Sequence, residues 1–212
     1  MEILDYLLHI DQYLEAILNE YQNWFYLILF LLIFIETGLV IMPFLPGDSL
    51  LFAAGMLAAA FPNQLNISIV IGLLWVAAIL GDTANYTIGK TLGTKLVTTK
   101  IFGKRIIQDA ALEKTENFFH KYGAKTIVIA RFVPIVRTLA PFVAGVSSMH
   151  YGTFIKYNVV GGTIWVVGIT LAGYFLGTIP FIQKNFEIVV LAIILFSLVP
   201  IVIEFIKEKM KK

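Results

Sequence analysis

Two stretches of apolar sequence that are interrupted by prolines and charges decide the fold. Residues 36–49 read ETGLVIMPFLPGDS, and residues 131–141 read RFVPIVRTLAP. Because proline lacks a backbone donor and clashes with the preceding helical turn, each run is expected to break near its middle. In lipid, a broken helix is tolerated only where protein or a water-filled cavity covers the freed backbone groups. Each stretch therefore predicts a broken helical hairpin in the interior of a membrane protein.

The composition of the whole chain also indicates a membrane location. The chain has 212 residues, of which 58% are apolar and 14% are charged, whereas soluble domains average about 25% charged residues. The mean hydropathy is +0.84. A soluble globule of this size cannot bury so much apolar surface, so we expect an integral membrane protein. The lack of cysteine excludes disulfides and cysteine catalysis, and a net charge of +2 is too small for a nucleic-acid-binding surface.

The basic residues distinguish the two sides of the membrane. Eight of the 16 Lys and Arg residues lie in the polar stretch 82–125, and four more lie in the C-terminal tail, whereas residues 1–23 contain none. By the positive-inside rule, the polar stretch and the tail are cytoplasmic and the N-terminus lies outside. The chain is therefore expected to cross a membrane several times.

These patterns predict an all-α polytopic membrane protein with two inverted repeats, each made of a proline-broken re-entrant hairpin and a spanning helix. The N-terminal segment fits either an amphipathic surface helix or an ordinary solvated cap. Whether residues 24–42 span or re-enter is open, since about 20 residues are needed to cross. The expected segments are an N-terminal amphipathic helix (1–23), a first repeat (24–81), a basic cytoplasmic linker with a surface helix (82–125), a second repeat (126–180), and a C-terminal spanning helix with a basic tail (186–212).

Charged residues flank both breaks, with opposite sign in the two hairpins. The first hairpin has the acids Glu36 and Asp48, and the second has the bases Arg131 and Arg137. An ionised group at mid-bilayer costs about 2.5–3.5 kcal/mol on insertion scales, so we expect the hairpins to meet and neutralise each other. Broken helices in two inverted halves favour a transport site, and arginines beside helix N-termini suit a phosphate group. The alternative is a salt-bridge cluster that only holds the hairpins together.

Other candidate residues are assigned supporting roles. Asp82 follows the third apolar run and is expected either to gate the cytoplasmic mouth or simply to end a helix. No metal site or cofactor is expected, because the three histidines are scattered, and no serine-nucleophile or phosphate-loop frame is present. The residues expected to shape the hairpins are Pro43, Pro46, Gly47, Ser49, Pro134 and Pro141.

Taken together, the motifs resemble those of the DedA family of membrane proteins, whose domain is also called the VTT or SNARE-associated type. The resemblance runs from about residue 20 to residue 180 and extends toward both ends. It rests on four groups of residues: Glu36, Gly38, Pro43, Pro46, Gly47, Asp48 and Ser49; Gly81, Asp82, Tyr86 and Gly89; Phe119, Tyr122, Gly123, Arg131, Phe132, Pro134, Arg137, Pro141, Ala144 and Gly145; and Trp165, Gly173, Tyr174 and Gly177.

The resemblance implies lipid transport across the bacterial inner membrane, above all of undecaprenyl phosphate, and phospholipid scrambling in distant eukaryotic relatives. It implies two inverted re-entrant hairpins surrounded by spanning helices. It also implies that Glu36 and Asp48 serve a proton-linked function and that Arg131 and Arg137 are essential. Membrane lipids and protons are then the expected partners, and a homo-oligomer is left open.

We therefore expect a protein that is not an enzyme but a flippase, in which Arg131 and Arg137 hold the phosphate while the polyprenyl tail stays in lipid. The alternatives are a scramblase or transporter of phospholipids such as phosphatidylethanolamine, and a proton-coupled ion exchanger. All three use the same residues, so they stay open. A membrane phosphatase is disfavoured, because neither His120 nor His150 is placed to attack phosphorus beside Arg131.

Overall fold

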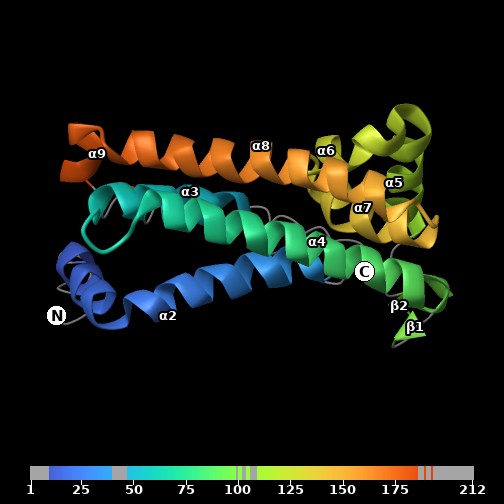
Figure 1. The fold of residues 1–212 in the computed structure, drawn as a ribbon, viewed down its shortest axis with the longest axis horizontal. Coiled ribbons are helices and arrows are strands. Elements are labelled where there is room, and N and C mark those ends of the chain that lie inside the picture. Colours follow the sequence, from blue (N-terminus) through green and yellow to red (C-terminus); the bar gives the residue numbers. More distant parts are fainter. Residues whose placement is uncertain are drawn as a thin grey trace, which may run out of the picture. The chain divides into compact units, whose positions relative to one another are not determined.

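The computed structural model describes residues 10–39, 47–98, 100–101, 104–105, 109–185, 189 and 192. This part of the chain is helical apart from one antiparallel pair of two-residue strands (Figure 1). Its elements are α2 (Ile10–Gly38), α3 (Gly47–Ala60), α4 (Ile67–Thr98), β1 (Lys100–Ile101), β2 (Lys104–Arg105), α5 (Asp109–Tyr122), a 3-10 turn (Gly123–Lys125), α6 (Thr126–Ala130), α7 (Pro134–Val146), α8 (Tyr151–Gly177) and α9 (Pro180–Lys184).

Within the described part of the chain, three helices are long and apolar enough to cross a membrane. The candidate spans are Leu18–Gly38 with 21 residues, and Ile67–Gly93 and Tyr151–Gly177 with 27 residues each. Since a helix rises 1.5 Å per residue, the two longer spans reach about 40 Å, beyond the ~30 Å apolar core of a bilayer. In the most apolar part of each of these three spans, no more than 33% is buried inside the protein. Side chains such as Trp24 and Phe175 remain on the surface, as expected for an all-helical membrane protein solvated by lipid.

Helix α2 contains the last part of the expected N-terminal helix and, after a kink, one long helical segment. Its backbone leaves helical geometry at Tyr21 (φ −120°, ψ 26°), two residues before the expected boundary at 23. The arm beyond this kink continues to Gly38, and the candidate span that contains it is 21 residues long, which is enough for a complete crossing. Pro43 and Pro46, which were expected to break this first hairpin, lie outside the described residues, as does most of the C-terminal segment 186–212.

Helix α4 is longer than the sequence predicts. We expected a helix end near residue 81, but α4 continues to Thr98, so Asp82 lies within a helix and the prediction that it marks a helix end is wrong. The threonines after Asp82 are accommodated in the helix, since their hydroxyls find acceptors on its own backbone. Thr83, Thr87 and Thr91 donate to carbonyls one turn earlier at 2.7 Å, 2.8 Å and 2.8 Å.

The described helices belong to two compact units, and α2, α4 and α8 each contribute to both. The first unit comprises the described residues of 1–30, 46–74 and 168–212. In this unit α3 packs closely on the C-terminal part of α8 through glycines. A Cβ added to Gly173 would lie 2.1 Å from the carbonyl oxygen of Phe52, and one added to Gly55 would lie 2.0 Å from that of Thr170.

The second unit comprises the described residues of 31–45 and 75–167. Here α7 packs on α4 in the same way. A Cβ added to Gly89 would lie 2.1 Å from the carbonyl oxygen of Phe142, and one added to Gly145 would lie 2.1 Å from that of Tyr86. Both helix pairs therefore approach backbone to backbone, which only glycine permits.

The glycine contacts of the two units match in spacing as well as in kind. Each short helix contributes a phenylalanine and a glycine three residues later, and each long helix contributes two glycines four residues apart. The matching residues are Phe52 and Gly55 in α3 with Gly173 and Gly177 in α8, and Phe142 and Gly145 in α7 with Gly89 and Gly93 in α4.

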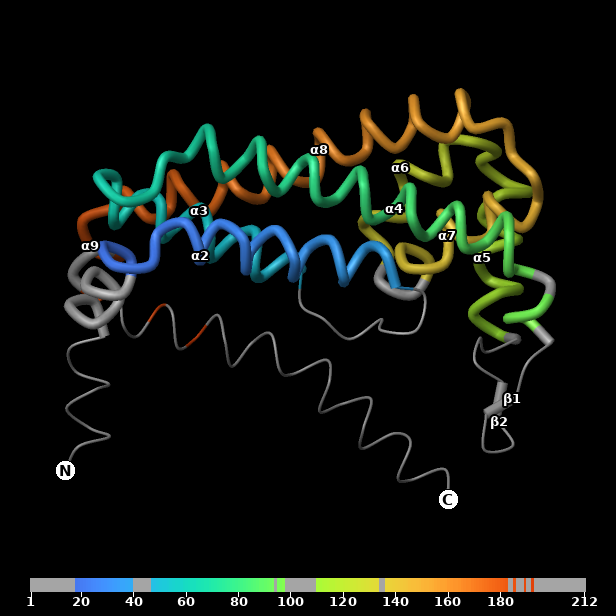
Figure 2. Tube along the Cα trace, turned by 60° about the horizontal axis from the view of Figure 1, so that its bottom comes forward, coloured from blue at the N-terminus to red at the C-terminus, as the bar shows by residue number. Residues whose placement is uncertain are grey.

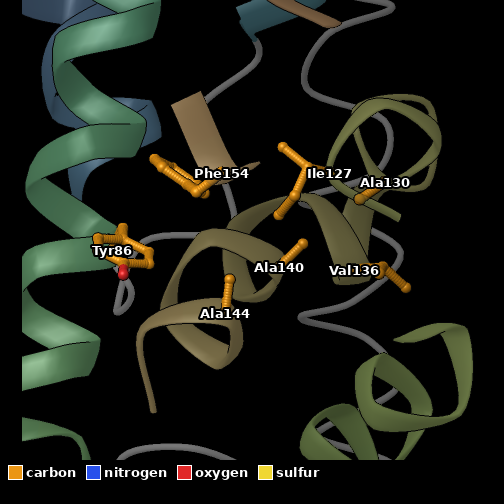
Figure 3. Packing of buried hydrophobic residues seen from close by; sticks show 7 residues of the cluster. All are labelled: Tyr86, Ile127, Ala130, Val136, Ala140, Ala144 and Phe154. Atoms are coloured by element: carbon orange, nitrogen blue, oxygen red, sulfur yellow. The ribbon is translucent and has the colours of Figure 1, made fainter. Parts of the chain in front are cut away.

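An apolar core fills the second unit around α7. Tyr86 of α4 stacks on Phe154 of α8 with ring centroids 4.5 Å apart, and its hydroxyl donates to the carbonyl of Met149. Figure 3 shows these rings beside Ala140 and Ala144, whose side chains project from α7 into the cluster. Small residues on α7 therefore let the large rings of the neighbouring helices come close.

Helix α5 covers another side of α7 within the second unit (Figure 2). Ala111, Leu112 and Phe119 of α5 pack on the α7 residues Leu139 and Phe142. Glu113, Lys114, Glu116 and Lys121 of α5 remain exposed. This amphipathic helix occupies the part of segment 82–125 where a surface helix was expected.

Candidate functional site

The break between α6 and α7 positions both arginines. Helix α6 ends at Ala130, and α7 begins with Pro134 in its first turn. Val133 is extended (φ −123°, ψ 101°), as expected for a residue before proline. Pro134 begins α7, whereas Pro141 lies inside that helix, so the expected break by paired prolines is corrected to a break that precedes one proline.

Arg131 forms a buried site with one residue from each of two long helices. Its Nη2 donates to Asp82 Oδ2 of α4 and, at 2.6 Å, to Asn158 Oδ1 of α8. Asn158 in turn donates to the carbonyl of Ile79 on α4 at 3.2 Å. The side chains of Arg131 and Asp82 are only 3% and 8% exposed. We call Arg131, Asp82, Asn158 and Ile79 the Arg131 site.

Two adjacent glycines of α8 make room for the Arg131 side chain. A Cβ added to Gly161 would lie 3.1 Å from Arg131 Nε, and one added to Gly162 would lie 3.5 Å from Arg131 Nη2. The helix backbone therefore covers the guanidinium on this side. A Cβ at Gly161 would require the arginine or α8 to give by a few tenths of an ångström, whereas a Cβ at Gly162 would only be in van der Waals contact with the arginine.

Arg137, in the first turns of α7, forms a second site with α2 and α8. Its Nη2 lies 2.9 Å from Glu36 Oε1, and its Cζ lies 3.9 Å from the centre of the Trp165 ring. The side chains of Arg137 and Glu36 are 11% and 6% exposed, and Trp165 is fully buried. A desolvated guanidinium over an indole face is a favourable cation–π contact of about 2 kcal/mol. We call Arg137, Glu36 and Trp165 the Arg137 site.

The side-chain amide of Asn85 donates hydrogen bonds to the backbones of both α2 and α7, the helices that carry Glu36 and Arg137. Its Nδ2 donates to the carbonyl of Thr37 at 3.1 Å and to that of Thr138 at 2.9 Å. These two residues directly follow Glu36 and Arg137 in the sequence. Asn85 is fully buried and lies one turn after Asp82 on α4, so α4 carries residues that serve both sites.

The two sites are neighbours and balance in charge. Arg131 Cζ lies 5.5 Å from the Trp165 ring that Arg137 stacks on. Two arginines face two acids, Glu36 and Asp82, so formal charges cancel. Such a cluster can exchange one carboxylate partner of a guanidinium for another anion, since phosphate and carboxylate fit the same planar donors. Among the described residues there is no group of three His, Asp or Glu side chains that could hold a metal.

The structure thus brings together four of the candidate residues: Glu36, Asp82, Arg131 and Arg137. The acid that faces Arg131 is Asp82, which sequence reasoning placed at a cytoplasmic helix end. Asp48 lies in the first turn of α3, in the first unit, and is exposed. Gly47 and Ser49 flank it in the same turn.

Sequence reasoning did not assign roles in the site to Asn85, Asn158 or Trp165. Asn85 follows Asp82 by three residues, which places both on one helical face once α4 is known to continue. Asn158 is an amide in an otherwise apolar run, and such residues in spanning helices usually have a buried partner. Trp165 lies seven residues after Asn158, on the same face of α8, which is the signal that could have linked it to the cluster.

Comparison with known proteins agrees with these features. Residues 45–175 match the VTT domain family. The chain is 51% identical over 207 residues to Protein DedA of Escherichia coli strain K12, covering 98% of this chain and 94% of that protein. It is 36% identical over 159 residues to the inner membrane protein YqjA of the same strain, covering 75% and 70%. It is also 44% identical over 170 residues to an uncharacterized membrane protein of Mycobacterium tuberculosis strain H37Rv, covering 80% and 74%.

No solved structure is significantly similar to the chain. The family assignment therefore rests on sequence. The VTT domain family matches more than half of the chain, and Protein DedA is 51% identical over nearly the full length of both chains. The chain therefore belongs to the DedA family of membrane proteins.

Proposed function

We propose that this protein is a lipid flippase that moves undecaprenyl phosphate across the membrane. The observation that carries the proposal is the Arg137 site, where an ion pair stacked on a buried tryptophan lies inside a lipid-solvated protein. An ionised phosphate is unstable in the apolar layer, as is any charged group at that depth. A guanidinium that releases a carboxylate to receive a phosphate lowers this barrier, while the polyprenyl tail stays in lipid.

A transporter with two inverted repeats is supported by the matching glycine contacts of the two units. Helices α3 and α7 carry equivalent Phe and Gly residues, and α8 and α4 carry equivalent glycine pairs. Each half of the chain thus supplies one short helix to pack on the long helix of the other half. In transporters built this way, substrates bind at broken helices near the midplane, and Pro134 marks such a break.

Glu36 is the acid that we propose for proton coupling at the Arg137 site, and the same role for Asp48, which is exposed in the first unit, stays a prediction. When a phosphate replaces Glu36 on Arg137, an ionised Glu36 would be left buried beside a second anion. Uptake of one proton by Glu36 removes this repulsion, and loss of that proton restores the carboxylate that displaces the phosphate. One proton therefore accompanies one phosphate through the site.

We place the protein in a bacterial inner membrane, with the N-terminus outside and with the C-terminus and the part of segment 82–125 that follows the candidate span Ile67–Gly93 in the cytoplasm. The basic residues of α5 and its flanks support this orientation, and the related YqjA is named an inner membrane protein.

The test is reconstitution in liposomes with fluorescent undecaprenyl phosphate and fluorescent phosphatidylethanolamine, assayed side by side. The proposal expects faster movement of the phosphate lipid than of the phospholipid, a loss of transport in Arg137→Gln, and a loss of the response to a pH gradient in Glu36→Gln. Equal movement of both lipids would instead indicate a scramblase. Cation flux linked to pH without any lipid movement would indicate an ion exchanger.

A further inference from the structure

The connection from α4 to α5 carries positive charge without any acid to balance it. Residues 83–108 contain five Lys and Arg residues and no Asp or Glu. Two of the five lie in the last turns of α4, where they are exposed, and three lie in the strands β1 and β2 that follow. We call these five residues the basic segment: Lys90, Lys95, Lys100, Lys104 and Arg105.

The register of the β1–β2 hairpin places like charges opposite each other. Lys100 pairs with Arg105, and Ile101 pairs with Lys104. Residues directly opposite in an antiparallel ladder share a face, and like charges at such positions are destabilising. Two isolated short strands are also at best marginally stable in water. An anionic partner beside the Lys100–Arg105 pair would offset this repulsion, so the register favours a bound counter-charge.

The basic segment begins where the apolar part of α4 ends. The candidate span ends at Gly93, and the helix continues to Thr98 before β1. At 1.5 Å per residue, β1 begins about 10 Å beyond the span. This length is close to the Debye length of about 8–10 Å at physiological salt. The charges of the hairpin are therefore within electrostatic reach of the lipid headgroups around the end of α4.

Helix α5, which follows the hairpin, has no comparable excess of positive charge. Its exposed side chains include Glu113 and Glu116 as well as Lys114 and Lys121, so these four formal charges cancel. The apolar side of α5 packs on α7. The uncompensated charge is thus confined to the end of α4 and the hairpin, and α5 offers a matched internal control.

We propose that the basic segment is a docking surface for the headgroups of anionic phospholipids in the leaflet where α4 ends. Clusters of four to eight Lys and Arg residues next to a spanning helix are suited to such lipids, and each base near the surface strengthens binding about fivefold. The five charges follow one another along α4, β1 and β2, as a layer of headgroups requires. This surface is separate from Arg131 and Arg137 and does not depend on the proposed transport function.

The experiment measures lipid binding at the hairpin itself. Each protein carries Ile101→Cys with an environment-sensitive fluorophore, which is unique because the natural chain has no cysteine. The hairpin variant adds Lys104→Gln with Arg105→Gln, and the control adds Lys114→Gln with Lys121→Gln in α5, which removes the same charge. The whole chain, purified in a neutral detergent, is titrated with phosphatidylglycerol, with phosphatidylcholine of the same acyl chains, and with glycerol phosphate.

The labelled parent should bind phosphatidylglycerol at least about tenfold more tightly than the other two probes. The hairpin variant should bind it at least about tenfold more weakly than the parent, since two bases are lost, and the α5 control should stay within about twofold. Equal losses in the two variants, or equal binding of phosphatidylcholine, would overturn the proposal. Glycerol phosphate or a single-stranded RNA that binds as tightly as the lipid would overturn a lipid surface.

A reversal of charge separates lipid binding from the stability of the hairpin. Arg105→Glu places an acid opposite Lys100, which turns repulsion within the hairpin into attraction. The variant should keep or raise the melting temperature of the protein and still weaken phosphatidylglycerol binding at least about tenfold. Unchanged binding, with or without a change in melting temperature, would show that Arg105 serves only the hairpin and would overturn the proposal.

Discussion

Arg131 and Asp82 form an ion pair whose two side chains are 3% and 8% exposed, with Asn158 as an additional acceptor. The pair joins the middle of α4 to the break before α7 across 49 residues of sequence. An intact buried ion pair adds little net stability, because burying both charges costs about as much as their attraction returns. Removing one partner is strongly destabilising, since the other charge is left buried alone.

Removal of one member of this pair should destabilise the protein strongly. Asp82→Asn leaves the charge of Arg131 buried without its counterion, which costs about 3–5 kcal/mol. The double variant Asp82→Asn with Arg131→Gln removes both charges and should recover more than half of that loss. Thermal unfolding in detergent of the two single variants and the double variant measures this coupling. Losses in the double variant that equal the sum of the single losses would contradict it.

The glycine contacts predict opposite effects of alanine at two positions of one helix. In α8, a Cβ at Gly173 would meet the Phe52 carbonyl oxygen at 2.1 Å, whereas a Cβ at Gly168 would meet nothing within 4 Å. Gly173→Ala should therefore destabilise by about 1–3 kcal/mol or more through overpacking. Gly168→Ala should stabilise by up to about 1 kcal/mol through helix propensity.

The same contrast is available in α4, which serves as an independent check. Gly89→Ala should be destabilising, since its Cβ would meet the Phe142 carbonyl, and Gly72→Ala should not, because nothing lies within 4 Å. Melting temperatures of all four variants decide the matter. Similar effects at the crowded and the open positions would mean that the helices do not pack as described.

The hydrogen bonds that Asn85 donates should be required for full stability of the protein. Asn85→Ala leaves the buried carbonyls of Thr37 and Thr138 without this partner, at a cost of about 1–3 kcal/mol for each buried group. Asn85→Asp should be worse than alanine despite its similar shape, because a carboxylate presents acceptors to two carbonyl oxygens. Thr87→Ala, on the exposed face of the same helix, is the control and should change stability by no more than about 0.5 kcal/mol. Aspartate tolerated as well as asparagine would contradict the geometry.

The orientation in the membrane can be tested with single cysteines, because the natural chain has none. Asn63→Cys and Glu113→Cys place a thiol at exposed positions between α3 and α4 and on α5. A membrane-impermeant maleimide should label Asn63→Cys in intact spheroplasts and Glu113→Cys only after the membrane is permeabilised. Labelling of both positions before permeabilisation would refute the proposed topology.

The sequence is sufficient to predict the helical membrane class and the break before Pro134. Both follow from local chemistry: apolar runs long enough to cross, and a proline in the first turn of α7. The presence of acids and arginines at depth also predicts ion pairing, since their charges cannot remain unpaired in lipid.

Which acid faces which arginine could not be predicted, because it depends on how far α4 extends. The polar composition after residue 81 suggests a helix end, which hides the fact that Asp82 lies beside Arg131. Asn85 and Trp165 were missed for a related reason. Their roles arise from contacts with α2 and α7; the spacing along α4 and α8 places them on the same helical faces as Asp82 and Asn158, but it does not identify the partners on other helices.

The threonines of α4 have a consequence for how such proteins sit in a bilayer. Thr87 and Thr91 turn their hydroxyls back onto the helix and leave their methyl groups as the outer surface. Hydropathy scales count these residues as polar, although their hydroxyls are already bonded within the helix. The apolar belt of α4 can therefore reach further than a hydropathy profile suggests, and a membrane boundary drawn from composition alone would fall short of the true one.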